Sequence, residues 1–149
     1  MKSKAILPLT LIFAGVVLMS VQLYRYSIDS SLQNWHSNFS GFIQANLEQK
    51  KTKKPLLLFF YTDWCPNCRK LRENVLSQND VNQYLENLIP VKINPETGKL
   101  ENQISNEFKV MGYPTILMIL PSEKVLNIRG LSNITPEKFI TRLNEAINS

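Results

Sequence analysis

Asp63-Trp64-Cys65-Pro66-Asn67-Cys68-Arg69-Lys70 contains both cysteines of this 149-residue chain. Two cysteines three positions apart can close a small, reversible disulfide. The segment before them, 56–61, is a continuous apolar run rich in aromatic residues, which is typical of a strand buried on both faces of a sheet. After them, apolar side chains at positions 68, 71, 75 and 76 follow helical spacing. The pair is therefore predicted where a buried strand turns into a helix.

The two sulfur atoms are predicted to differ, because a helix N-terminus presents unpaired N–H groups and about half a positive charge. Cys65 is expected to be the exposed, nucleophilic thiolate, and Cys68, one turn further on, the shielded resolving thiol. Pro66 suits the first helical turn, and Arg69 and Lys70 add positive charge. In such pairs the pKa of the attacking thiol falls from about 8.5 to between about 3.5 and about 7.5.

A C-x-x-C pair is also half of a zinc site, but a structural zinc needs four ligands. His36 is the one histidine of the chain, so a single chain cannot close such a site and dimerisation would be required. A purely structural disulfide is disfavoured because so short a loop removes little entropy from the unfolded chain. The pattern favours redox chemistry with no metal and no organic cofactor.

A second motif, Val110-Met111-Gly112-Tyr113-Pro114-Thr115-Ile116, follows later in the chain. Together with Lys54-Pro55 and the cysteine motif, it makes residues 32–149 resemble the thioredoxin superfamily, and most closely its exported bacterial members. The resemblance implies an α/β thioredoxin fold, in which helices flank a central mixed sheet. It also implies a cis Tyr113–Pro114 bond packed against the disulfide, with the Tyr113 backbone pairing with a bound substrate.

The resemblance implies the residues of the site as well. The residues expected to be catalytic are Cys65 and Cys68, and those expected to contact the substrate are Trp64, Pro66, Tyr113 and Pro114.

One position departs from the family pattern. Many thioredoxins carry a buried acid six residues before the first cysteine, where it helps to remove the proton of the resolving thiol, whereas this chain has Phe59. Lys92 matches the lysine that pairs with this acid and is expected to lack its partner. The proton of Cys68 therefore needs another route, while attack by Cys65 is unaffected.

Residues 1–25 are predicted to form an N-terminal signal-anchor or transmembrane segment. Lys2 and Lys4 precede an uncharged run from Ala5 to Tyr24, which at about 1.5 Å per residue spans the ~30 Å of a bilayer core. A cleaved signal peptide begins in the same way, but no A-x-A-like cleavage site follows. A buried core helix is disfavoured because the run has no polar face. Lys2 and Lys4 precede the run and only Arg25 flanks its other end. This excess of basic residues predicts a cytoplasmic N-terminus and a domain on the other side of the membrane.

The remaining pattern predicts one domain over 32–149 after a short polar linker at 26–31. Its expected elements are an amphipathic helix over 32–49, a short helix near 80–85, a strand over 88–93, a helix around 100–108, a hairpin of strands 115–120 and 125–129, and a last helix from Thr135. Thr135-Pro136-Glu137 combines a capping hydroxyl, a proline and an acid in the first turn.

Charge and length narrow the class of protein. The chain has 17 basic and 12 acidic residues; without Lys2, Lys4 and Arg25 the rest of the chain keeps 14 basic and 12 acidic residues, a net charge of +2, so no nucleic-acid partner is indicated. The segment 32–149 is long enough for one core and too short for two domains. We expect a monomeric, single-pass protein of the inner membrane with its domain in the periplasm or at the cell exterior, or a protein secreted after signal cleavage.

These features predict thiol-disulfide exchange with other proteins. Cys65 attacks a partner's disulfide, Cys68 resolves the mixed disulfide, and electrons pass to or from a redox partner protein. The reducing direction is favoured by the resemblance and by the membrane tether. The alternatives are a protein-disulfide oxidase or isomerase, and a non-catalytic module that holds extended peptides at Tyr113-Pro114.

Overall fold

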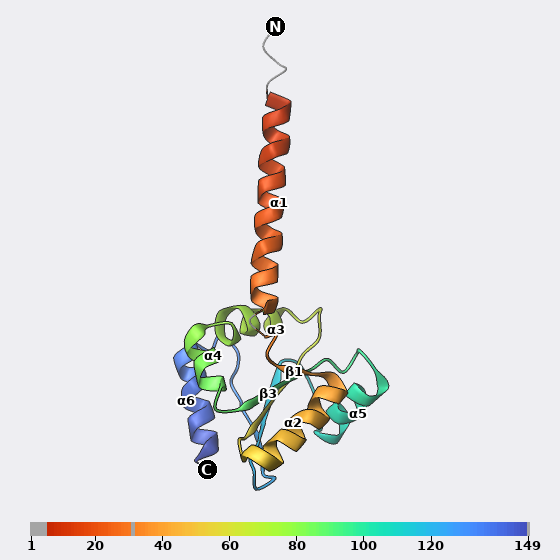
Figure 1. The fold of residues 1–149 in the computed structure, drawn as a ribbon, viewed down its shortest axis with the longest axis vertical. Helices are drawn as coiled ribbons and strands as arrows, with labels where there is room; N and C mark the ends of the chain where they lie inside the picture. Colours follow the sequence, from red (N-terminus) through yellow and green to blue (C-terminus); the bar gives the residue numbers. More distant parts are fainter. Residues whose placement is uncertain (1–5, 31, 149) are drawn as a thin grey trace. The chain divides into compact units, whose positions relative to one another are not determined.

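The computed structural model describes residues 6–30 and 32–148 (Figure 1). The chain divides into two compact units, one up to Gln33 and one from Asn34 onward. In the first unit, residues 6–24 of the uncharged run lie in a helix, α1 (Ile6–Ser30). Across the described part of the chain, no helix combines the length and the apolar character needed to cross a bilayer. The anchor or transmembrane segment expected over 1–25 stays a prediction from the sequence.

The second unit is built on a five-stranded mixed sheet with the order β1-β3-β2-β4-β5. The strands are β1 (His36–Ser37), β2 (Leu56–Phe60), β3 (Ile89–Ile93), β4 (Thr115–Ile119) and β5 (Val125–Asn127). β2 lies in the middle, parallel to β3 and antiparallel to β4, while β1 and β5 form the two edges. This mixed sheet with helices on its faces confirms the expected α/β class.

The central strand β2 is buried along its whole length, as its unbroken apolar sequence predicts. Its side chains alternate between two faces. On one face, Leu56, Leu58 and Phe60 join a cluster with residues of β3 and β4 and with Ala45 and Ile104. On the other, the Phe59 ring meets Trp35 edge-on at 6.3 Å between centroids and stacks on Tyr61 at 5.3 Å. The strand therefore brings two separate layers of core to the point where it ends.

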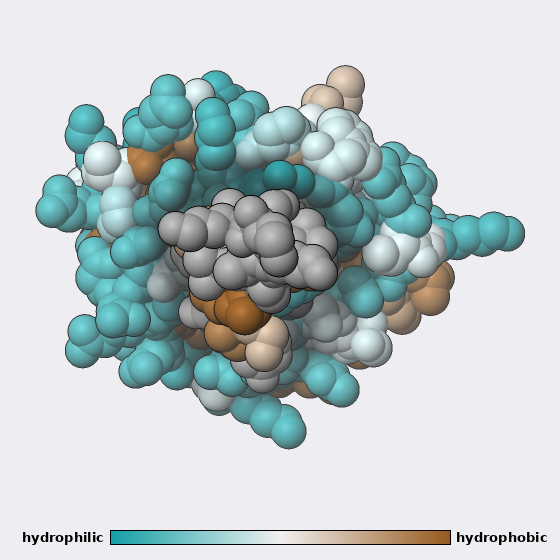
Figure 2. Space-filling view, turned by 90° about the horizontal axis from the view of Figure 1, so that it is seen from above, coloured by the Kyte–Doolittle hydropathy of each residue, from teal (hydrophilic) through white to brown (hydrophobic). Residues whose placement is uncertain are grey.

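Helices cover both faces of the sheet (Figure 1). On one side lie α2 (Asn38–Thr52) and α5 (Lys99–Glu107), and on the other lie α3 (Pro66–Leu71), the π-helical turn η1 (Arg72–Leu76), α4 (Asn79–Leu85) and α6 (Pro136–Ile147). Thr135 caps α6, since its side chain accepts a hydrogen bond from the Lys138 N–H, as the sequence predicts. In the face shown by Figure 2, hydrophilic residues predominate over the outer parts of the surface, which is the pattern of helices that turn their apolar sides inward.

Two elements differ from the sequence-based expectation. The helix predicted over 32–49 begins only at Asn38, because His36 and Ser37 instead pair with Val91 and Lys92 at the edge of β3. Pairing with the edge of β3 satisfies the backbone N–H and C=O groups of these two residues. The apolar periodicity of the sequence does not reveal this pairing. The helix after the cysteines changes to a π-helical turn at Arg72, an irregularity that often marks a functional region.

Candidate active site

The two cysteines form a disulfide at the start of α3, with their Cα atoms 5.3 Å apart. Cys65 is the N-cap residue, and its Sγ accepts a hydrogen bond from the Cys68 N–H at an N···S distance of 3.1 Å. Pro66 occupies the first turn, and the Arg69 N–H donates to the Cys65 carbonyl at 3.2 Å. The pair thus lies between the end of β2 and the first helical turn, where the sequence places it.

Both cysteines are almost fully covered, with exposed fractions of 4% for Cys65 and 3% for Cys68. The structure holds the disulfide form, so the exposure expected of the Cys65 thiolate in the reduced protein stays a prediction. In the disulfide form the Cys65 sulfur lies within reach of the Cys68 amide. What distinguishes the two sulfurs is this hydrogen bond to Cys65 Sγ, because an amide donor stabilises negative charge on the sulfur that accepts it.

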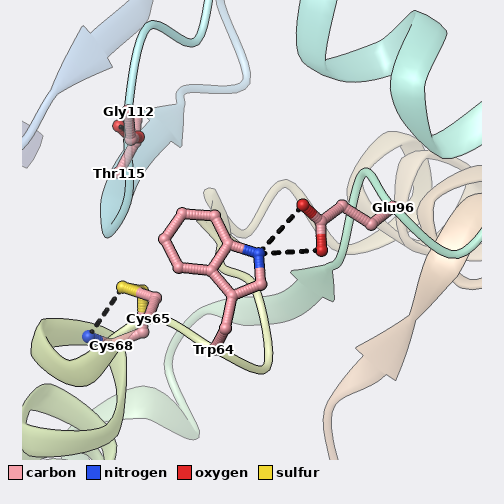
Figure 3. Close-up of a disulfide and its surroundings, with 6 residues drawn as sticks. All are labelled: Trp64, Cys65, Cys68, Glu96, Gly112 and Thr115. Atoms are coloured by element: carbon pink, nitrogen blue, oxygen red, sulfur yellow. Dashed lines mark hydrogen bonds between the residues drawn. A yellow bond between two sulfur atoms is a disulfide. The ribbon is translucent and has the colours of Figure 1, made fainter.

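Trp64 forms the exposed side of the site, with 65% of its surface accessible. Its Nε1–H points to both carboxylate oxygens of Glu96 at 3.0 Å, and its ring meets Tyr113 edge-on at 6.5 Å between centroids. In Figure 3 the indole lies beside the disulfide and extends toward Glu96. Two of the residues predicted to contact substrate, Trp64 and Tyr113, are therefore neighbours.

The turn that carries Glu96 is tied to the loop before Cys65 through Asn94, which is buried. The Asn94 Nδ2 donates to Asp63 Oδ2 at 3.3 Å, and its Oδ1 accepts from the Glu96 N–H at 3.0 Å. Residues 94–98 are rich in turn-forming residue types, but the sequence does not reveal this connection. Predicting that β2 and β3 pair in parallel would have indicated the connection, because this pairing brings the loops after both strands to one edge of the sheet.

The Tyr113–Pro114 bond is cis, as the resemblance implies. After it, the Thr115 Oγ1 donates to the Gly112 carbonyl at 2.8 Å. Pro114 and Asn67, the latter from the C-P-N-C motif, line one groove of about 380 Å³ that continues along residues 127–132. Pro66 is exposed but does not line this groove. The groove was not foreseen from the sequence, since it joins three distant segments.

On the inner side of the disulfide lies a cavity of about 10 Å³, lined by both cysteines and by Phe59, Thr62 and Arg72 among others. Phe59 is 1% exposed and fills the position at which many thioredoxins carry an acid. Lys92 faces it in the register of β2 and β3, and within the described residues Lys92 forms no ion pair. Two buried polar atoms near the cysteines, Thr62 Oγ1 and Arg72 Nε, have no hydrogen-bond partner.

Titratable groups of the described residues show no arrangement for a metal. No group of three or more His, Cys, Asp or Glu side chains in that part of the chain is close enough to hold an ion. His36 instead pairs with Glu48 on α2 at 3.0 Å.

Comparisons with known proteins agree with this geometry. A family model described as a thioredoxin-like domain matches residues 44–147. The chain is 30% identical over 105 residues to the thiol:disulfide interchange protein DsbD of Haemophilus ducreyi, covering 67% of this chain and 18% of that protein. It is 32% identical over 80 residues to a protein disulfide-isomerase of Hordeum vulgare, covering 54% of this chain and 15% of that protein. This chain thus spans less than a fifth of the length of either relative.

Solved structures share the fold at lower identity. A structure described as DsbH oxidoreductase has a TM-score of 0.67 at 22% identity, covering 76% of this chain and 83% of that chain. The reduced C-terminal domain of Neisseria meningitidis DsbD has a TM-score of 0.62 at 19% identity, covering 73% and 97%. With the family model matched over residues 44–147 and the fold shared with these structures, the chain belongs to the thioredoxin-like domain family.

Proposed function

We propose that this protein is a thiol-disulfide oxidoreductase that exchanges disulfides with partner proteins. The observation that carries the proposal is the Cys65–Cys68 disulfide at the start of α3, with the Cys68 amide donating to Cys65 Sγ. The family supports it, as do relatives that are named for thiol:disulfide interchange and for disulfide isomerisation.

In the reduced protein, Cys65 is the nucleophile. The amide of Cys68 and the N-terminal end of the helix favour its thiolate, so we expect its pKa to lie below the ordinary value of about 8.5. The thiolate attacks a disulfide of the partner, one partner sulfur leaves as a thiolate and takes a proton from water, and a mixed disulfide remains. Cys68 then attacks Cys65 Sγ, which releases the second partner thiol and transfers two electrons in all.

The partner is proposed to lie against the residues around the disulfide. Trp64 offers an exposed ring that Glu96 and Tyr113 hold in place, and rigid exposed aromatic rings are favoured anchors at interfaces. An extended segment of the partner would run past Pro114, beside the groove that Asn67 also lines, and would meet Pro66, which is exposed at the start of α3. Backbone pairing with Tyr113 would fix its direction.

Trapping of mixed disulfides tests the assigned roles. Cys68→Ser removes the resolving thiol, so this variant should accumulate covalent adducts with its partners that migrate more slowly on non-reducing gels. Cys65→Ser is the matched control, because it removes the same number of sulfur atoms and should trap almost nothing. Equal trapping by both variants would refute the roles. Trapping by neither, with normal folding, would favour a non-catalytic module that holds peptides in the groove.

The direction of exchange is proposed to be reducing, with a second redox protein as the electron source. Equilibration of the Cys65–Cys68 pair with glutathione measures its potential, and each tenfold change in the equilibrium constant corresponds to about 30 mV. A potential near that of reducing thioredoxins, together with reduction of insulin, supports a reductase. A potential well above that of the glutathione pool would instead identify an oxidase or isomerase.

The location is proposed to be outside the cytoplasm, because Lys2 and Lys4 precede the uncharged run Ala5–Tyr24. A C-terminal alkaline phosphatase fusion of the full chain should then be active. Fractionation decides between a membrane-held form and a form secreted after cleavage, and an inactive fusion would contradict export.

A further inference from the structure

The cavity behind the disulfide is lined by the basic residue Arg72, while β2 contributes Phe59 rather than an acid. It is lined by Phe59, Thr62, Asp63, Cys68 and Arg72, together with further residues. Arg72 follows Cys68 by one turn, and its N–H donates to the Cys68 carbonyl. Because side chains four positions apart lie on the same face of a helix, the guanidinium and the Cys68 sulfur share this side of the helix.

Two residues that line the cavity have buried polar atoms without the hydrogen bonds that such atoms normally form. Arg72 Nε and Thr62 Oγ1 are both buried without a hydrogen-bond partner, although buried polar groups in folded proteins are nearly always paired. Phe59 offers neither a hydrogen bond nor a proton acceptor. The buried Nε–H of the half-buried Arg72 therefore lies in the lining of the same cavity as Cys68, where it can stabilise negative charge when that thiol ionises.

We propose that Arg72 stabilises the thiolate of Cys68 and so allows the resolving step to proceed without a buried acid. This inference rests on the proposed exchange reaction. Cys68 loses its proton, its electron pair attacks Cys65 Sγ, the bond between Cys65 and the partner breaks, and the partner's thiolate takes up a proton from water. The proton of Cys68 leaves through the cavity toward Asp63, which lines it and is exposed to solvent.

The charges around Cys68 are expected, on balance, to favour its thiolate over its neutral thiol. Arg69 and Arg72 line the cavity from the helix, Asp63 lines it from the preceding loop, and Tyr61 lines it from the end of β2. The Asp63 carboxylate opposes ionisation of Cys68, but Asp63 is exposed, and its charge is screened by water. Arg72 is half-buried and its Nε is buried, so water screens its charge less than that of Asp63. We therefore expect the positive charge to have the larger effect on Cys68.

The test titrates Cys68 alone, in the full chain carrying Cys65→Ser, by the absorbance of the thiolate near 240 nm. Arg72→Met should raise the Cys68 pKa by about one unit, the smaller end of the shifts that a nearby opposite charge produces. Arg72→Lys should retain most of the effect because it keeps the charge. Lys70→Met is the matched control: it removes one positive charge from the same helix at a residue that does not line this cavity, and it should leave the pKa of Cys68 unchanged.

The rate of the resolving step gives a second readout, in protein with both cysteines. Closure of a mixed disulfide between Cys65 and glutathione should be about threefold slower at pH 7 in Arg72→Met. A pKa raised by one unit reduces the thiolate fraction tenfold, and the greater nucleophilicity of the more basic thiolate offsets about threefold of that loss. If Arg72→Met fails to fold, Arg72→Gln replaces it.

Three outcomes overturn the inference: an unchanged Cys68 pKa in a folded Arg72→Met or Arg72→Gln variant, an equal shift in Lys70→Met, or a loss in Arg72→Lys as large as in Arg72→Met. None of these bears on the exchange reaction, because trapping by Cys68→Ser tests that reaction without reference to the pKa of Cys68.

Discussion

The outer and inner sides of the disulfide differ in their exposure to solvent and in their hydrogen bonding. On the outer side, Trp64 is largely exposed and is held by hydrogen bonds that connect loops. On the inner side, Phe59 is fully packed, and two polar atoms of Thr62 and Arg72 lack partners. The outer side is suited to contact with a partner protein, and the inner side to control of the sulfur chemistry. Substitutions on the two sides should therefore produce separable effects.

The largest expected effect comes from placing a carboxylate on the inner side. Phe59→Asp removes a ring that packs against Trp35 and Tyr61 and buries a charge, so the free energy of unfolding should fall by several kcal/mol. In whatever folded protein remains, resolution by Cys68 should be faster near neutral pH, because the new carboxylate accepts its proton. Urea unfolding and the pH dependence of mixed-disulfide closure measure the two effects.

Phe59→Leu is the control for this substitution, since it keeps the site apolar and should cost only about 1–2 kcal/mol. A pH–rate profile of folded Phe59→Asp that coincides with that of Phe59→Leu would show that the proton of Cys68 already has an efficient route.

The next effect concerns the connection that holds the outer side together. Asn94→Ala removes hydrogen bonds to Asp63 and to the Glu96 N–H at a buried position, so the free energy of unfolding should fall by about 1–3 kcal/mol. Asn102→Ala, at an exposed position of α5, is the control and should change it by less than about 0.5 kcal/mol. Equal losses in urea unfolding would mean that the Asn94 connection has no structural role.

A third change isolates partner recognition. Trp64→Ala removes the exposed ring beside the disulfide, and kcat/KM toward a protein disulfide should fall about tenfold, or about 1.4 kcal/mol. The reaction with a small disulfide such as oxidised glutathione should change less than about twofold, because the sulfurs keep their surroundings. Glu96→Gln keeps a hydrogen-bond acceptor for the indole and should have a smaller effect. Equal losses toward both substrates would contradict the separation of the two sides.

Local sequence signals predicted the elements that carry the cysteines. The apolar run of β2, the spacing of Cys65 and Cys68 and the start signal at Thr135 each act within a few residues of the chain, so that pattern and propensity sufficed. The cis bond at Pro114 came from the family resemblance, since a sequence alone shows only that a proline permits it.

The contacts that complete the site could not be predicted from local sequence patterns. Glu96 reaches Trp64 from a turn 32 positions away in the sequence, and no periodicity links the two. The role inferred for Arg72 depends on burial of one nitrogen beside a cavity, which requires the packed structure. The short strand β1 was missed for the same reason, because pairing with β3 overrides the helical pattern that begins at residue 32. Tertiary contacts decided each of these positions.

The smallest effect is expected for a substitution at Tyr84, which belongs to neither side of the disulfide. It tests whether the properties of the site are independent of packing elsewhere in the core. Tyr84 on α4 donates its hydroxyl to Asn144 Oδ1 on α6 at 2.7 Å. Burial raises the pKa of Tyr84 above its ordinary value of 10.0. The folded protein therefore holds this proton more tightly than the unfolded chain does, so the contribution to stability is complete below pH 10 and declines as the pH rises through the folded pKa.

Tyr84→Phe should accordingly lower the free energy of unfolding slightly at pH 8, by about 0.5–1 kcal/mol for the lost hydrogen bond, and should flatten the decline above pH 10. Urea midpoints at pH 8 and pH 10.5 measure both effects, and equal slopes in the two proteins would contradict the assignment to Tyr84. Because the α4–α6 contact shares no residue with the cavity behind Cys68, the pKa of Cys68 should be the same in Tyr84→Phe as in the unaltered protein. A shift there would mean that the inner side responds to packing throughout the core rather than to the charge of Arg72.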